Sequence, residues 1–178
     1  MDVERVRLQL DLAAFDDAAF VLYLHRCRTS GINFTSVSEL GDDGENRRAL
    51  YELNNACAAD IPERGEFYTF DEYLTERIDT PAYDPDGVVI AVDDGRWVGM
   101  TTTSLHRAED YAFSEMTGVL RSHRGQGISL AMKLLAITFA RSRGIRWLRT
   151  FHHPDNASAI GMNRRLGFVD EDGQRWTA

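Results

Sequence analysis

The chain has 178 residues, of which 43% are hydrophobic and 27% charged, with 4 prolines. This composition is typical of one soluble globular domain and excludes a disordered or fibrous protein. No apolar run approaches the roughly 18 residues of a membrane span, and the first residues lack the start and cleavage site of a signal peptide. With a net charge of −8 and two cysteines, we expect a cytoplasmic protein with free thiols, no metal, and no nucleic-acid or membrane partner.

Residues 1–30 are predicted to form a strand and a helix ahead of the main domain. Residues 3–10 alternate apolar and charged side chains, as a half-buried strand does. Residues 11–28 have apolar positions about one helical turn apart, and Gly31 ends that helix. We treat residues 1–30 as an N-terminal strand-helix appendage, whose strand joins the sheet of its own chain or of a second copy in a homodimer.

Residues 31–178 are predicted to fold as one α/β (α+β) domain with a mixed sheet. The predicted strands are 32–37, 88–92, 97–102, 111–120 and 147–151, with short strands at 168–169 and 174–177. The predicted helices are 45–59, 69–78, 128–143 and 156–165. The helix over 128–143 is apolar on two sides, which predicts that it packs between a sheet and another layer.

Charge is divided unevenly along the chain. Residues 1–95 carry 21 acidic and 8 basic residues, whereas residues 96–178 carry 7 and 12. This polarity suits a site where a polyanion meets the second half of the chain and a cation meets the first. An ordinary solvated surface explains it equally well.

One turn carries the clearest chemical signal. The strand over 111–120 leads through a turn with Gly125 and Gly127 into the long helix. Glycine lets the backbone approach a ligand closely, and the start of a helix presents unpaired N–H groups to an anion. The turn therefore predicts a phosphate or diphosphate site, with a plain tight connection as the alternative. It lacks the features of a Walker loop or of a dinucleotide-binding fold.

The stretch from Arg124 to Ser129 resembles the Arg/Gln-x-x-Gly-x-Gly/Ala signature of the GNAT superfamily of N-acetyltransferases, which binds the diphosphate of acetyl-CoA. Further on, Asn156, Asn163 and Leu166-Gly167-Phe168 are similar to the family's Asn-x-x-Ala/Met…Tyr-x-x-x-Gly-Phe element. The two motifs occur in the order and spacing that the family shows.

The resemblance is clear over residues 86–168, weaker over 31–85 and absent over 1–30. It implies that residues 31–178 form a GNAT domain, with a central mixed, mostly antiparallel twisted sheet and helices on both faces. It also implies acetyl-CoA, or another acyl-CoA, as co-substrate.

The resemblance assigns a set of residues to the co-substrate. The backbone of Thr117, Gly118 and Val119 would pair with the pantetheine arm, and the Val119 N–H would face the thioester oxygen. Asn156 would hydrogen-bond the arm or the structure around it. The diphosphate would be held by the turn and the helix start, residues Arg124, Gly125, Gln126, Gly127, Ile128, Ser129 and Leu130.

The general acid is not evident. Asn163 stands where many family members carry a Tyr that protonates the departing thiolate. An amide cannot act as a general acid near neutral pH, although it can hydrogen-bond the sulfur. A thiol with a pKa of about 8.5 is a fair leaving group even without full protonation.

The candidate general base is Glu115. Strict alternation along a strand would put it on the same face as Thr117 and Val119, and family members often use a Glu in this strand to deprotonate the amine. An ordinary solvent-facing carboxylate is the alternative, and protons can also leave to solvent. Lesser candidates are His106, Glu109 and Asp110.

The resemblance implies transfer of an acetyl group from acetyl-CoA to a primary amine by direct attack in a ternary complex. Two alternatives stay open: a CoA-binding or interaction module without turnover, and a transferase for a longer acyl group. An acidic and aromatic stretch over residues 63–73 suits a cationic acceptor, or simply helix packing. The identity of the acceptor stays open.

Overall fold

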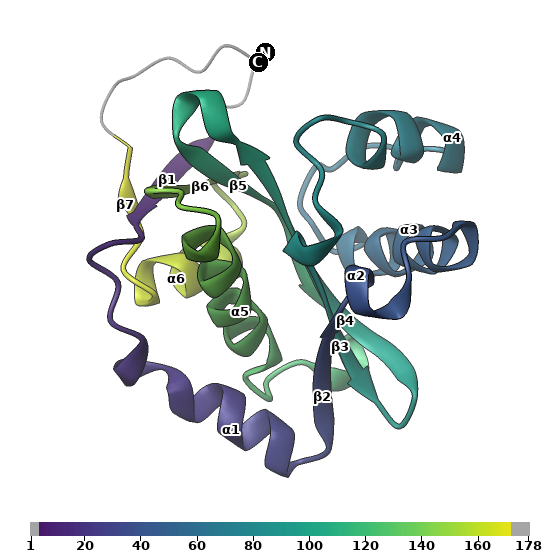
Figure 1. Cartoon of the computed structure of the whole chain (residues 1–178), viewed down its shortest axis with the longest axis horizontal. Coiled ribbons are helices and arrows are strands. Elements are labelled where there is room, and N and C mark those ends of the chain that lie inside the picture. Colours follow the sequence, from purple (N-terminus) through teal and green to yellow (C-terminus); the bar gives the residue numbers. More distant parts are fainter. Residues whose placement is uncertain (1–3, 172–178) are drawn as a thin grey trace.

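The computed structural model describes residues 4–171. Within them, one seven-stranded sheet has the order β2-β3-β4-β5-β6-β1-β7 (Figure 1). Neighbouring strands are antiparallel except β5 and β6, which are parallel, so the sheet is mixed and mostly antiparallel, as predicted. The strands are β1 (Val6–Asp11), β2 (Ile32–Ser36), β3 (Val88–Asp93), β4 (Arg96–His106), β5 (Tyr111–Val119), β6 (Trp147–His152) and β7 (Val169–Asp170).

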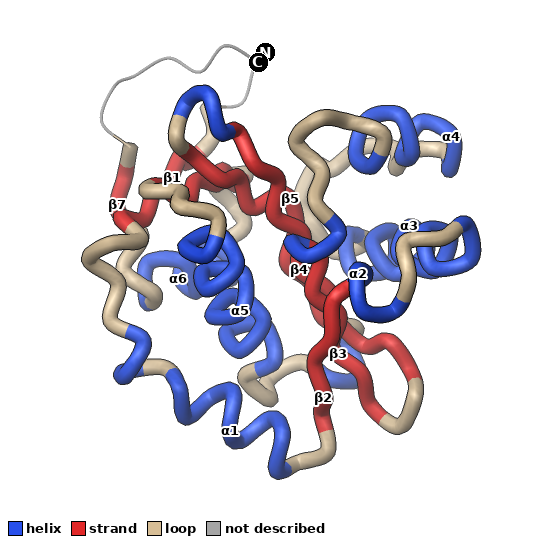
Figure 2. Tube along the Cα trace, viewed as in Figure 1, coloured by secondary structure: helices blue, strands red, loops and turns tan. Residues whose placement is uncertain are grey.

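Helices cover both faces of the sheet (Figures 1 and 2). One face carries α1 (Val21–Thr29), α5 (Ile128–Ser142) and α6 (Ala157–Arg165). The other carries α2 (Val37–Leu40), α3 (Gly44–Ala58) and α4 (Phe70–Tyr73), which continues as a π-helical turn, Leu74–Ile78. Single 3₁₀ turns lie at Asp17–Ala19, Pro85–Gly87, Arg107–Glu109 and Arg121–His123.

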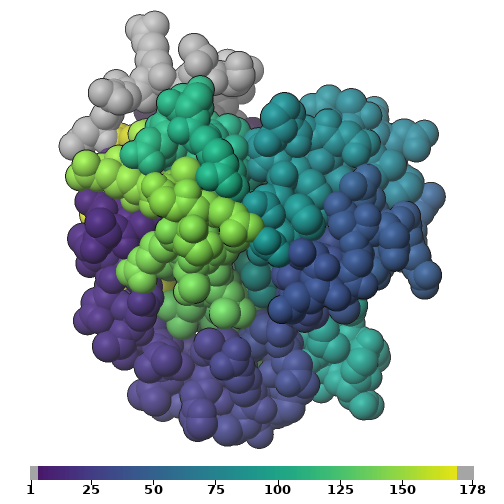
Figure 3. Space-filling view, viewed as in Figure 1, coloured from purple at the N-terminus to yellow at the C-terminus, as the bar shows by residue number. Residues whose placement is uncertain are grey.

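Helix α5 lies between the sheet and α1, as its two apolar sides predict. In the space-filling view the purple N-terminal segment wraps around the green surface of α5 (Figure 3). The buried residues of α5 divide between two cores on the same face of the sheet. The helix is thus held from both sides, and its start is fixed relative to the sheet.

Strand β1 lies inside the sheet, between β6 and β7. Six residue pairs join it to β6 and two join it to β7. Its Leu8 and Leu10 are buried in the core that α5 and β6 share. The strand therefore joins the sheet of its own chain. The boundary at residue 30 between an appendage and the domain stays a prediction.

The first helix is shorter than predicted. Residues 11–28 begin with turns, and α1 starts only at Val21. The side chains of Asp11 and Asp16 accept hydrogen bonds from the N–H groups of Ala13 and Ala18, and such local bonds compete with helix formation. The strand predicted over 174–177 lies outside the described residues.

Truncation of Leu8 tests whether β1 is an integral part of the core. Leu8 is 0% exposed, so Leu8→Ala is expected to lower the free energy of unfolding by roughly 2–5 kcal/mol. Urea denaturation followed by circular dichroism measures this change. Arg7→Ala, at the exposed neighbour in the same strand, is the control. Equal stability of both variants would contradict the place of β1 in the core.

Candidate active site

Strands β5 and β6 pair over only three residue pairs. Their parallel pairing ends at Phe113↔Arg149, and beyond this point each strand continues without the other. The gap between them opens into a cavity of about 1360 Å³. Typical small-molecule pockets measure roughly 300–1000 Å³, so this cavity has room for two substrates.

The predicted anion site lies on the wall of this cavity. Gly125 and Gly127 have φ angles of 77° and 79°, in the left-handed region that glycine adopts without strain. Gly127 caps α5 without a side-chain hydrogen bond, and the first helical bond runs from the Ala131 N–H to the Gly127 carbonyl over 3.0 Å. The first-turn N–H groups therefore have no partner within the helix. They belong to Ile128, Ser129 and Leu130, which line the cavity.

Arg124 stabilises this turn through two hydrogen bonds. Its Nε donates to the Val119 carbonyl at 3.0 Å, and its Nη1 donates to Asp60 at 2.8 Å. Asp60 also pairs with Arg121, and the Arg121 and Arg124 guanidinium groups hold the pKa of Asp60 well below its usual range. The turn is thereby tied to the segment that follows α3.

Part of the backbone of β5 faces the gap. The N–H of Leu120 donates to β4 over 2.9 Å. Because N–H groups alternate between the two edges of a strand, those of Thr117 and Val119 point away from β4 and toward the gap. A Cβ at Gly118 would lie 2.5 Å from the Cβ of Cys57, so glycine is needed there for α3 to pack on β5.

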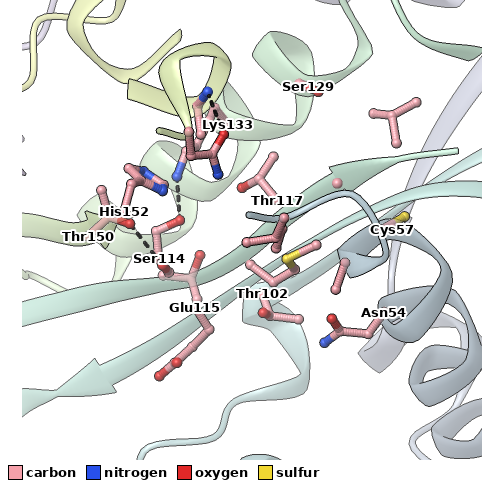
Figure 4. A pocket seen from close by; sticks show the side chains of 18 of the residues that line it. Asn54, Cys57, Thr102, Ser114, Glu115, Thr117, Ser129, Lys133, Thr150 and His152 are labelled. Carbon is pink, nitrogen blue, oxygen red and sulfur yellow. Dashed lines mark hydrogen bonds between the residues drawn. The ribbon is translucent and has the colours of Figure 1, made fainter. Parts of the chain in front are cut away.

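Glu115 does not share a face with Thr117 and Val119, so that prediction is wrong. The register of β4 and β5 shifts at this point, and Glu115 has no partner residue on β4, as in a β-bulge. The extra residue reverses the alternation beyond it. Glu115 points to the side opposite Ser114 (Figure 4), and Met116 beside it packs in the core under α3 and α4.

On that side, Glu115 lies in a polar group. Its carboxylate accepts hydrogen bonds from Arg77 at 2.6 Å and from the Ser104 hydroxyl at 2.7 Å. The ring of His106 lies 3.1 Å from the same hydroxyl. Glu115 and His106 line the cavity, whereas the other two base candidates are not among the described lining residues.

Lys133 of α5 lies where β5 and β6 separate. It is 1% exposed, and its ammonium donates a hydrogen bond to the hydroxyl of Ser114 (Figure 4). Burial lowers the pKa of Lys133 to about 7, because an apolar environment disfavours the charged form. The sequence analysis missed this residue, although composition held a signal: Lys133 is the only lysine in the chain.

Asn163 lies in the same gap and is fully buried. Its Nδ2 donates to His152 Nε2 at 2.8 Å and to the Ala159 carbonyl at 3.0 Å. Burial and the charge of Lys133 lower the pKa of His152 to about 4, so this ring is neutral near pH 7. Among the residues that the structure describes, Asn163 Oδ1 and Thr103 Oγ1 have no hydrogen-bond partner. Unpaired polar atoms are costly when buried, which favours a polar ligand in the gap.

The remaining predicted residues have structural partners. Asn156 caps α6, with its Oδ1 accepting from the Ala159 N–H at 3.3 Å. The carbonyl of Gln126 faces the Cys27 thiol at 3.7 Å, and Gln126 is not among the described lining residues of the cavity. Tyr23 of α1, which the sequence analysis did not select, lines the cavity, and its ring would lie 3.1 Å from a Cβ at Gly127.

The acidic and aromatic stretch forms another part of the wall. Six residues of the stretch 63–73 line the cavity: Glu63, Arg64, Glu66, Phe67, Tyr68 and Tyr73. Glu76 and Arg77 line it just beyond the stretch. Within residues 4–171, no helix is long and apolar enough to cross a membrane. The same residues contain no group of three or more His, Cys, Asp or Glu side chains that could hold a metal ion.

The chain matches the model of the Acetyltransferase (GNAT) family over residues 47–168. It belongs to this family. It is 31% identical over 134 residues to the mycothiol acetyltransferase of Pseudarthrobacter chlorophenolicus, a match that covers 72% of this chain and 41% of that protein. The mycothiol acetyltransferase of Stackebrandtia nassauensis is 29% identical over 138 residues, covering 75% of this chain and 43% of the relative. The chain thus spans about two fifths of the length of these relatives.

Solved structures share the fold. A GCN5-related N-acetyltransferase from Sphaerobacter thermophilus superposes with a TM-score of 0.65 at 20% identity, covering 94% of this chain and 48% of that chain. The GNAT fold expected from the two motifs is therefore confirmed.

The buried lysine predicts a pH-dependent stability. The pKa of Lys133 is about 7 in the folded state against 10.5 ordinarily, so between these values the unfolded state binds more protons. Unfolding free energy should then rise with pH, by up to ~1.4 kcal/mol per pH unit from this residue. Lys133→Met should remove that rise and be more stable near pH 7. Urea denaturation between about pH 6 and 9 measures how the unfolding free energy of the wild type and of the variant changes with pH. Equal slopes for the two proteins would contradict a lowered pKa of Lys133.

Proposed function

We propose that this chain transfers an acetyl group from acetyl-CoA to a primary amine by direct attack in a ternary complex. The observation that carries the proposal is that one cavity joins the N–H groups left unpaired at the start of α5 to the gap between β5 and β6. Fixed N–H donors at a helix start suit the diphosphate of coenzyme A. The N–H groups of Val119 and Thr117 then offer hydrogen bonds to a linear pantetheine arm.

The acetyl-CoA residues are those predicted from the motifs, with two refinements. The Val119 N–H is proposed to bind the pantetheine arm near the diphosphate instead of the thioester oxygen, because the arm then runs on along β5 toward Ser114. Because Arg124 is bonded to Asp60 and to Val119, we assign it to holding the turn. The N–H donors to the diphosphate then come from the backbone of residues 125–127 and of the first helical turn of α5.

The acceptor is proposed to enter on the side of Glu115 and to be cationic. The segment after α3 lines this part of the cavity with Glu63, Glu66 and Glu76, with aromatic rings, and with Arg64 and Arg77. Together with Glu115, the carboxylates outnumber these arginines, and the excess of negative charge attracts an ammonium group. Glu115 would accept the proton of the attacking amine directly or through water. The relatives named as mycothiol acetyltransferases support acetyl transfer, and we propose the acceptor here only by class, as a primary amine.

A charge reversal at the helix start tests cofactor binding. Ser129 lines the cavity in the first turn of α5, where an acidic residue stabilises a helix but repels a phosphate. Ser129→Glu should therefore keep its melting temperature while its affinity for coenzyme A falls about 100-fold, a loss of about 2.7 kcal/mol. Isothermal titration calorimetry measures the affinity. Ser122→Glu, an exposed position just before the turn, is the control; equal losses in both variants would contradict a specific site.

Turnover is tested by thiol release from acetyl-CoA with pooled primary amines. Glu115→Gln should lower kcat about 100-fold, since a general base contributes typically that much or more, and leave coenzyme A affinity unchanged. Glu109→Gln, a carboxylate on the neighbouring turn, should keep full activity. Tight coenzyme A binding without any thiol release in the wild type would instead favour a binding module. Faster release with longer acyl donors would favour a different acyl group.

A further inference from the structure

Nearly all basic residues of this chain are arginines. It contains 19 arginines and a single lysine, Lys133, and that lysine is the one that is fully buried in the gap. Arginine does not lose its proton in proteins, whereas a buried lysine does so readily. If this position needed only a fixed positive charge, arginine would serve here as it does elsewhere in the chain. Lysine differs because its ammonium can give up a proton.

Within residues 4–171, no carboxylate pairs with Lys133 to hold this proton. Burial alone accounts for its lowered pKa, with no acidic group contributing. The groups around it are the Ser114 hydroxyl on β5, the neutral ring of His152 on β6, and the ring of Phe168, whose centroid is 5.7 Å from Nζ. Glu115 follows Ser114 directly on β5, but its carboxylate points to the other side of the sheet.

Lys133 also lies at the far end of the proposed path of the pantetheine arm. The path starts at the turn before α5 and follows β5 from Val119 toward Ser114. Five residues of extended chain span about 17 Å. The thioester at the end of the arm would then reach the region where Ser114 holds Lys133. The unpaired Asn163 Oδ1 and Thr103 Oγ1 are buried in the same region.

We propose that Lys133 is the proton donor to the sulfur of coenzyme A as it departs, a role that the amide of Asn163 cannot fill. This inference rests on the proposed function. The amine nitrogen forms a bond to the thioester carbon, the carbon–sulfur bond breaks, and its electron pair stays on sulfur. The sulfur takes a proton from Lys133 Nζ, the nitrogen loses one to Glu115 or water, and Lys133 regains one from solvent.

The acidities agree with this direction of transfer. An ammonium with a pKa of about 7 is a stronger acid than a thiol with a pKa of about 8.5, so the proton moves to the thiolate. Ser114 orients the ammonium through its hydroxyl. The active form is the protonated one, so activity that depends on Lys133 falls as the pH rises through its pKa.

Kinetics of three variants test the proposal. Lys133→Met should lower kcat about 100-fold while calorimetry shows unchanged coenzyme A affinity, and should abolish the fall of kcat/KM above about pH 7. Lys133→Arg keeps the charge but not a transferable proton, so it should not restore activity. Leu134→Met, a buried neighbour outside the cavity wall, should behave as wild type. The proposal would be overturned if Lys133→Arg kept the wild-type kcat. It would also be overturned if Lys133→Met lost the low-pH limb of the kcat/KM profile instead of the high-pH limb.

A second measurement needs no turnover. Lysine labelled with ¹³C gives one side-chain signal, because the chain has one lysine. Coenzyme A should shift the titration of that signal upward by stabilising the ammonium beside its sulfur, whereas desulfo-coenzyme A should not. If the Lys133 signal titrated at the same pH with both ligands, the role of Lys133 would be overturned, whereas cofactor binding would still stand. Absence of coenzyme A binding by calorimetry would overturn the proposed function itself.

Discussion

The separation of β5 and β6 after three residue pairs is the constraint on which the site depends. A parallel pair that continued would occupy its own N–H and C=O groups, and no ligand could lie between the strands. At the fork, the hydroxyl of Thr150 donates to the carbonyl of Ser114 at 3.2 Å. This bond satisfies a backbone group just where strand pairing ends. The strands can therefore separate without leaving that carbonyl buried and unpaired.

Helix α5 fixes both ends of the proposed acetyl-CoA path. Its first turn presents free N–H groups, and one turn later the same face carries Lys133, because residues four apart lie above one another on a helix. Ser129 and Lys133 are four apart, and both line the cavity. Since α5 is packed between the sheet and α1, the distance between its first turn and the backbone of Lys133 is fixed, and the hydrogen bond to Ser114 fixes the end of the lysine side chain.

The sequence predicts well what depends on local pattern. Glycine spacing at Gly125 and Gly127, apolar periodicity along α5 and the two family motifs identify the fold before any coordinates, and they predict the anion site. It fails where one residue alters a regular pattern. The bulge at Glu115 is set by how β4 and β5 pair, and no feature of the strand's own sequence marks it. The burial of Lys133 depends likewise on which face of α5 meets the fork.

That single extra residue places the two groups proposed to transfer protons, Glu115 and Lys133, on opposite sides of the sheet. In an unbroken strand, Glu115 would share the α5 side with Thr117, and Ser114 would face α3 and α4. The bulge exchanges them, so that Ser114 faces Lys133 and Glu115 faces Arg77 and the segment after α3. A carboxylate beside Lys133 would hold its proton by ion pairing, and the lysine could not release it to sulfur. Keeping the two apart is what the proposed mechanism requires, in which Glu115 takes the proton of the amine and Lys133 gives one to the thiolate.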